Sequence, residues 1–171
     1  MEPDRQPVLT GERVAIRPMT AADWQPQFAV ASDRELWAIH PAHDRWQEPV
    51  FRAFFDASLR SGGGLTILDA GSGAVIGGTR YGEWDRARGR IEIGWTFLAR
   101  SHWGGTYNAE LKRLMLDHIH RWVPTVTFVV GEGNLRSRRA LEKIGAVLLP
   151  ESEVRRMAGR DVVHLTYAHH A

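Results

Sequence analysis

The chain has 171 residues, 43% of them hydrophobic and 25% charged, which favours one globular domain spanning residues 1–171. Cysteine is absent and no apolar run approaches the roughly 20 residues of a membrane span, which excludes disulfides, thiolate metal sites, a cysteine nucleophile and a transmembrane helix. The formal net charge is +2 and the arginines are scattered, so a nucleic-acid partner is not favoured. The first residues lack the basic-then-apolar order of a secretory signal, and we therefore expect a cytoplasmic protein.

The first third of the chain predicts one strand and two helices. Alternating polar and apolar residues indicate strands, whereas apolar residues spaced three and four apart indicate helices. We expect, in order, a loose lead-in over residues 1–12, a strand over 13–17 stopped by Pro18, a helix capped by Thr20 that runs to Ala31, an irregular segment over 35–47, and a helix that starts at Pro49 and ends before Gly62.

The remainder predicts six more strands and two more helices. Strands are expected over 65–69 and 75–81 around the hairpin turn Gly71-Ser72-Gly73, over 90–98, over 126–130, and over 147–149 and 162–167 around the turn Ala158-Gly159. A helix with one apolar stripe follows Gly104 and is stopped by Pro124, and a second is capped by Asn134 and closed by Gly145. The order βααβββαβαββ is that of an α/β sandwich built on a mixed sheet.

The stretch Glu92–Asn108 predicts an anion site, because a strand there runs through a glycine turn directly into a helix. A helix N-terminus presents unpaired N–H groups and the positive end of the helix dipole, and Gly104 and Gly105 allow an anion to approach the backbone closely. A tight strand–helix turn without a ligand is the alternative. Other phosphate loops fit less well, since no G-x-x-x-x-G-K-[ST] occurs and the glycines at 71 and 73 lead into a strand.

A second motif follows about 30 residues later. Residues 134–145 read N-x-x-S-x-x-x-x-E-K-x-G, and residues 92–95 read E-I-G-W before the glycine turn. With these motifs the chain, from Arg13 to Tyr167, resembles the GNAT superfamily, most closely its branch of ribosomal-protein N-acetyltransferases. The resemblance implies a splayed mixed sheet flanked by helices, acetyl-CoA as cosubstrate without a metal, and transfer of the acetyl group to an amine.

The resemblance also implies where acetyl-CoA would bind. The strand backbone would pair with the pantetheine arm, the glycine turn would hold the pyrophosphate, and Ser137 would face the sulfur. The implied cofactor-binding residues are Phe97, Leu98, Trp103, Gly104, Gly105, Thr106, Tyr107, Asn108 and Asn134. The sequence departs from the family twice. Trp103, Thr106 and Asn108 replace the usual residues of the phosphate loop, and Leu141 replaces the tyrosine that protonates the leaving thiolate.

Three residues are candidate catalytic groups. Glu92, an acid in an apolar strand, is either a general base or a carboxylate paired with an arginine across the sheet. Glu83 is the second candidate base, and Ser137 or water would deliver the proton to the thiolate. Asn134 could instead be only a helix cap.

The eight histidines do not have metal-ligand spacing, so we expect no metal site. Trp24, Trp37 and Trp46 either pack in the core or form a wall of the acceptor site.

Without a cysteine, the reaction would be direct attack by a neutral amine on the thioester, with the oxyanion held by a backbone N–H near Phe97. Two other classes compete: an acyl-CoA-binding module without activity, and an arginine-rich RNA-binding domain. The acceptor stays open between a protein N-terminus, a ribosomal protein, a polyamine and an aminoglycoside, and a homodimer is compatible with the sequence.

Overall fold

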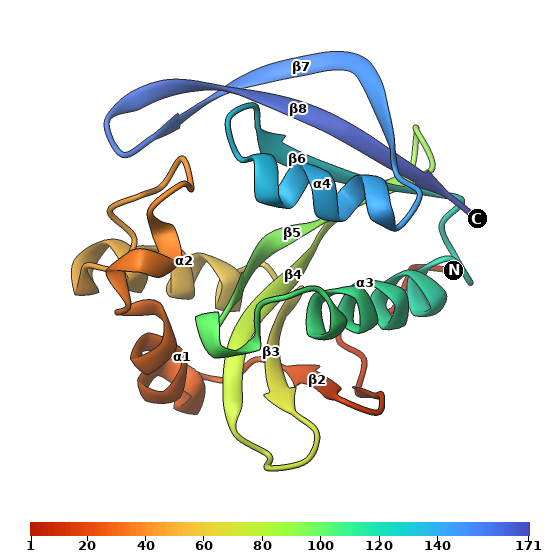
Figure 1. Cartoon of the computed structure of the whole chain (residues 1–171). Helices are drawn as coiled ribbons and strands as arrows, with labels where there is room; N and C mark the ends of the chain where they lie inside the picture. Colours follow the sequence, from red (N-terminus) through yellow and green to blue (C-terminus); the bar gives the residue numbers. More distant parts are fainter.

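The computed structural model describes residues 1–171 and contains one eight-stranded sheet in the order β1-β2-β3-β4-β5-β6-β8-β7 (Figure 1). The strands are β1 (Leu9–Thr10), β2 (Val14–Pro18), β3 (Gly64–Asp69), β4 (Val75–Asp85), β5 (Arg90–Leu98), β6 (Thr125–Gly131), β7 (Val147–Met157) and β8 (Arg160–His170). Only β5 and β6 are parallel; every other neighbouring pair is antiparallel.

Helices flank the sheet. They are α1 (Trp24–Ala31), α2 (Glu48–Arg60), α3 (Thr106–Ile119) and α4 (Leu135–Lys143), with 3-10 turns η1 (Ala21–Asp23), η2 (Arg34–Trp37) and η3 (Arg100–His102). This mixed, helix-flanked sheet confirms the predicted fold class. The predicted order lacks only the two-residue strand β1.

α3 and α1 pack on opposite faces of the sheet. On one face the hydroxyl of Tyr81 in β4 donates to the carbonyl of Met115 in α3 at 2.7 Å. On the other face Gln27 of α1 donates to the hydroxyl of Thr66 in β3 at 3.0 Å. The predicted stripe of α3 fills the first face, where its Leu111, Met115 and Ile119 are fully buried. Each such side chain stabilises the fold by about 1.5–3 kcal/mol through burial.

The other face carries an aromatic cluster contributed by α1 and α2. Phe51 and Phe55 of α2 are buried there, and Trp24 of α1 stacks on both Phe28 and Phe51. Phe97 of β5 belongs to the same cluster, with its ring 5.4 Å from that of Phe51. The apolar positions of α2 predicted from their helical spacing therefore form the contact between this helix and the sheet.

The lead-in is a correction to the sequence-based expectation. Residues 1–12 are not loose, because Leu9 pairs with Ile16 and the guanidinium of Arg5 donates to the carbonyl of Gly82 at 2.9 Å. Pro3 and Pro7 are buried. The contact between Arg5 and Gly82 joins residues 77 positions apart in the sequence, so no local pattern predicts it.

The final hairpin is longer than predicted. β7 and β8 extend over 11 residues each and meet at Ala158 (φ 48°) and Gly159 (φ 74°), the positive angles of a two-residue hairpin turn. Figure 1 shows the hairpin reaching past α4. Most of β7 is exposed on both sides, and its residues therefore lack the apolar alternation by which a half-buried strand is recognised.

Candidate active site

β5 and β6 pair only at their start and then separate. Their parallel register runs from Arg90 beside Thr125 to Glu92 beside Thr127 and stops there. β5 stays paired with β4 as far as Leu98, and β6 stays paired with β8 as far as Gly131. The register between β4 and β5 shifts by one residue near Trp95, whose φ is 53°, and such a bulge bends its strand. The sheet is thus open between the two strands beyond Glu92.

A cleft of about 810 Å³ occupies this opening, within the size range of small-molecule sites. The glycine turn, α3 and α4 line one end of it. The loop after η2, the start of β5 and the β7–β8 hairpin line the other end. Among the lining residues are Trp103, Gly104, Gly105, Asn108, Lys112, Asn134, Ser137 and Leu141 at the first end, and Trp37, His40, Arg45, Glu92, Arg155 and His164 at the second.

The glycine turn opens toward the cleft at the start of α3. Gly104 and Gly105 have φ values of 110° and 105°, which only glycine adopts readily, and a Cβ on either would meet no atom within 4 Å. The indole N–H of Trp103 donates to the carbonyl of Leu98 at 2.8 Å, and the guanidinium of Arg136 lies 3.7 Å from the centre of the Trp103 ring. The turn therefore combines an open helix N-terminus with a nearby cation, as an anion site requires.

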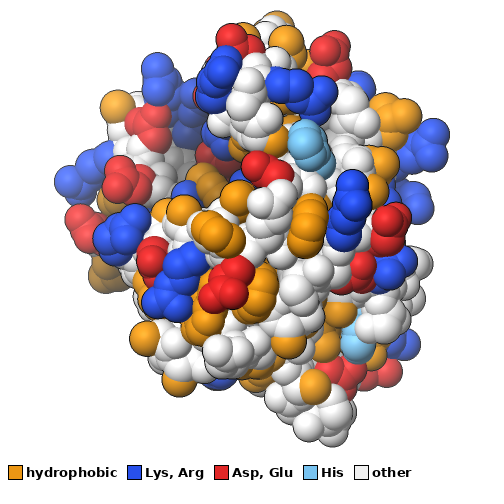
Figure 2. All heavy atoms as spheres, turned by 90° about the vertical axis from the view of Figure 1, so that its left-hand side faces the viewer, with side chains coloured by type: hydrophobic (Ala, Val, Ile, Leu, Met, Phe, Trp, Pro, Cys, Tyr) orange, Lys and Arg blue, Asp and Glu red, His pale blue; other side chains and the backbone are white.

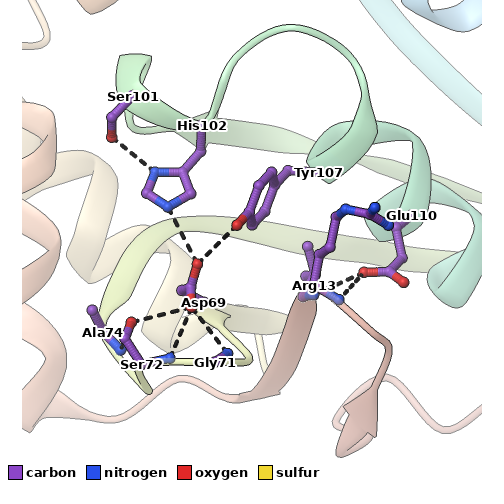
Figure 3. A network of polar contacts seen from close by, with 10 residues as sticks. Arg13, Asp69, Gly71, Ser72, Ala74, Ser101, His102, Tyr107 and Glu110 are labelled. Carbon is purple, nitrogen blue, oxygen red and sulfur yellow. Dashed lines mark hydrogen bonds and ion pairs between the residues drawn. The ribbon is translucent and has the colours of Figure 1, made fainter.

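Asp69, at the end of β3, holds the turn from behind (Figure 3). Its carboxylate accepts a hydrogen bond from the hydroxyl of Tyr107 at 3.0 Å and lies 3.4 Å from the ring of His102. The backbone N–H of Ser72 and the hydroxyl of Tyr107 lower the pKa of Asp69 to about 2, so it stays ionised. Both ends of the glycine turn are thereby fixed to the β3–β4 hairpin.

Not all predicted cofactor residues line the cleft. Phe97, Leu98, Trp103, Gly104, Gly105, Asn108 and Asn134 do so. Thr106 and Tyr107 do not, and the Tyr107 ring points to Asp69 instead (Figure 3). The carbonyl of Leu98 is already bonded to Trp103, which leaves the rest of the strand edge for a ligand.

Asn134 lies in the cleft and caps α4 at the same time. Its side chain is buried, and its Oδ1 accepts a hydrogen bond from the backbone N–H of Ser137 at 3.4 Å. Ser137 also lines the cleft. The cap fixes the side chain of Asn134 where a ligand between β5 and β6 would pass.

Replacing Asn134 with alanine is expected to lower the free energy of unfolding by about 1 kcal/mol, the usual effect of losing a helix cap. If Asn134 also binds the ligand, the affinity for CoA should fall as well. Chemical denaturation gives the first quantity and calorimetric titration with CoA the second. Unchanged CoA affinity in a destabilised variant would leave Asn134 with the capping role alone.

Glu92 lies at the point where the strands separate and is paired with an arginine, as one of its two interpretations predicts, whereas its role as a general base stays a prediction. Its carboxylate is 3.4 Å from the guanidinium of Arg155 in β7 and is four-fifths buried. Burial raises the pKa of Glu92 by more than Arg155 and Arg80 lower it. A carboxylate with a raised pKa in a cleft can accept a proton. Glu83, in contrast, is exposed at the end of β4 and does not line the cleft.

The family model for the Acetyltransferase (GNAT) domain matches residues 13–147. The chain belongs to the GNAT acetyltransferase family. A search among curated proteins gave no match. Among solved structures, a GCN5-related N-acetyltransferase from Brucella melitensis is 20% identical with a TM-score of 0.83, covering 98% of this chain and 80% of that one. A GNAT-family acetyltransferase from Bacillus anthracis is 17% identical with a TM-score of 0.77, covering 95% and 98%.

A third similar structure is the spermidine N-acetyltransferase from Vibrio cholerae in complex with CoA and spermine. It is 14% identical with a TM-score of 0.70, and the alignment covers 94% of this chain and 96% of that one. At these identities the three structures show a shared fold.

Lys112 is a residue of this GNAT acetyltransferase that the sequence analysis missed. It extends from α3 into the opening between the strands, where its ammonium donates to the hydroxyl of Thr96 in β5 at 3.1 Å and lies 5.5 Å from the Phe128 ring in β6. No carboxylate pairs with it, and burial lowers its pKa to about 8. Its place beside the apolar stripe, three residues before Met115, is the signal that could have drawn attention to it.

Leu141, in the position of the family's tyrosine, is buried in the core cluster on the α3 face and lines the cleft. Of the three tryptophans, Trp37 lines the cleft, whereas Trp24 packs among α1 and α2 and Trp46 lies against the same aromatic cluster.

No three His, Asp or Glu side chains gather in a way that could hold a metal ion. No helix is long and apolar enough to span a membrane.

Proposed function

We propose that this protein is an N-acetyltransferase that transfers the acetyl group of acetyl-CoA to a primary amine by direct attack within a ternary complex. The single observation that carries the proposal is a cleft that runs between splayed strands and has different chemistry at its two ends. An open helix N-terminus lies at one end and the buried carboxylate of Glu92 at the other. The fold that the protein shares with the CoA-bound V. cholerae enzyme supports it.

The first end suits CoA. The glycine turn and the N–H groups at the start of α3 would bind the pyrophosphate, with Arg136 beside them. The edge of β5 that faces the opening has no strand partner after Glu92 and would pair with the pantetheine amides. Asn134 would bond the arm near the thioester, and Ser137 would face the sulfur.

The second end suits the amine, and the protons balance across the cleft. Glu92 takes a proton from the ammonium of the acceptor, and the neutral amine attacks the thioester carbon. A backbone N–H of β5 near Phe97 stabilises the oxyanion. The C–S bond then breaks while the nitrogen loses its second proton to solvent, and Lys112 protonates the thiolate. Glu92 afterwards releases its proton to solvent and Lys112 takes one up, so that one proton is released for each acetyl group transferred. A thiol pKa near 8.5 is close to the pKa of about 8 of Lys112, which favours that transfer.

CoA is expected to stabilise the protein against thermal unfolding, since a ligand that binds only the folded state shifts the equilibrium by mass action. At 100 times its dissociation constant CoA should add about 2.7 kcal/mol. A thermal-shift titration measures this. Adenosine is the control ligand. It should give a smaller thermal shift than CoA, because it lacks the pyrophosphate and the pantetheine arm. No shift at millimolar CoA would contradict the proposal.

Release of free CoA thiol from acetyl-CoA in the presence of a panel of amines tests the activity itself. Turnover separates an acetyltransferase from a module that only binds acyl-CoA. A steep decrease of RNA affinity with salt would instead favour the RNA-binding alternative. Membership in the ribosomal-protein N-acetyltransferase branch, a cytoplasmic location and a homodimer stay predictions from the sequence.

A further inference from the structure

Arg45 is a cation of the cleft that has no polar partner in the protein. It lies in the loop between η2 and α2 and lines the second end of the cleft. Its guanidinium carbon is 4.2 Å from the ring centre of Phe54 and 5.2 Å from that of Trp37. Both distances are within the range of cation–π contacts, which use the ring faces and leave the N–H donors of the guanidinium free for other partners. None of these donors makes a hydrogen bond or an ion pair, although other arginines of the protein do.

The surroundings of Arg45 do not neutralise it. Burial lowers its pKa to about 10, with a smaller opposite effect from Asp44, so it remains charged near neutral pH. His40 beside it adds no charge, because burial lowers the pKa of that imidazole to about 3. The backbone N–H of Ala42 donates to Nδ1 of His40, as the neutral ring permits. Arg45 is therefore a charged group without an ion-pair partner among the residues that line the second end of the cleft.

The cleft as a whole favours an anionic occupant. Its only carboxylate is that of Glu92, which is paired with Arg155. Arg80, just behind, stacks 3.5 Å above the ring of Trp95, and its buried Nε has no partner. Figure 2 looks onto the side where this loop and the tip of the hairpin lie, and it shows acidic and basic side chains interspersed over the surface. The excess of basic over acidic side chains is therefore found among the residues that line the cleft.

We propose that Arg45 binds an oxyanion group, a carboxylate or a phosphate, carried by the amine acceptor. The inference rests on the proposed acetyl transfer and names its substrate class: small amines that bear an anionic group. The aromatic contacts of Arg45 use none of its N–H donors, and two parallel N–H donors of a guanidinium fit two oxygens of such a group. A polyamine, by contrast, would bring further positive charge to Arg45.

Matched pairs of amines test this substrate class. Phenylalanine is compared with phenethylamine, and O-phosphoethanolamine with ethanolamine, so that each pair differs mainly in the anionic group; spermidine is the cationic control. Binding to the protein saturated with CoA is measured by calorimetry, which requires no turnover. We expect the member with the anionic group, in at least one pair, to bind 10-fold or more tightly than the partner that lacks this group. The pair that shows the preference also reveals whether carboxylate or phosphate is recognised.

Arg45→Met should weaken binding of the preferred anionic amine by about 10- to 100-fold, the change expected when a charge-assisted hydrogen-bonded pair is lost. Binding of the matched amine without the anionic group and binding of CoA should stay unchanged. Arg45→Lys keeps the charge but not the fork, and it should retain only part of the preference. Arg34→Met is the matched control, because Arg34 also stacks on a tryptophan, Trp46 at 5.7 Å, but does not line the cleft.

Three results would overturn the inference: amines without an anionic group, or spermidine, binding as tightly as those that bear one; Arg45→Met weakening every amine alike; or Arg34→Met having the same effect as Arg45→Met. Free-thiol release with the same amines is scored separately. If anionic amines bind through Arg45 but acetyl-CoA is never consumed, the anion site stands and the proposed acetyl transfer is wrong.

Discussion

Glu92→Gln is expected to lower kcat about 100-fold at pH 7, the usual contribution of a general base. Glutamine keeps the size of the side chain but cannot hold the proton, and an amine with the pKa of lysine is almost wholly protonated at neutral pH. Turnover of the variant should partly recover as the pH rises, because the free amine becomes more abundant. CoA affinity should change little, since Glu92 lies at the acceptor end of the cleft.

The pH profile gives the sharper test. Glu92 must be ionised to act, and burial raises its pKa, so wild-type kcat should fall as the pH drops through that raised value. The variant should lack this step. Glu153→Gln is a suitable control, because Glu153 also pairs with Arg155, at 3.0 Å, but is exposed. Glu83→Gln tests the other predicted base. Wild-type turnover of Glu92→Gln across the pH range would leave Glu92 as a partner of Arg155 only.

Lys112→Met is expected to lower kcat by a similar factor, about 100-fold, because the thiolate would then depend on water for its proton. Lysine must be protonated to donate, so wild-type kcat should fall as the pH rises through about 8, and the variant should lose that decrease. Stability should not fall, since methionine replaces a buried charge that has no ionic partner. Steady-state kinetics across pH 6–10, with a thermal melt of each variant, measure both effects.

Lys112→Arg separates proton transfer from charge. Arginine keeps the positive charge but does not release its proton in this pH range, so it should be nearly as slow as the methionine variant. An arginine variant with wild-type turnover would mean that Lys112 acts by its charge alone. Lys143→Met, which removes a cleft lysine on the exposed side of α4, should leave the alkaline step in place.

Much of the fold follows from local patterns. The strand over residues 90–98 has the predicted limits, α3 buries the predicted stripe, and Asn134 and Gly145 border α4 as expected. Such patterns report the local backbone period and the residues that start or stop an element. The hairpin of β7 and β8 was underestimated because it is largely exposed, and the lead-in was wrong because long-range contacts fix it.

The sequence by itself determined the mixed fold, the glycine turn ahead of α3 and the family, because each depends on residues that are close together in the chain. The tertiary structure decided what those elements enclose. It placed Glu92 from β5 beside Arg155 from β7, brought Lys112 between the separated strands, and left Arg45 stacked but without an acceptor. Charge, burial and the absence of a partner are properties of a three-dimensional neighbourhood, and the residues that make it up come from segments far apart in sequence.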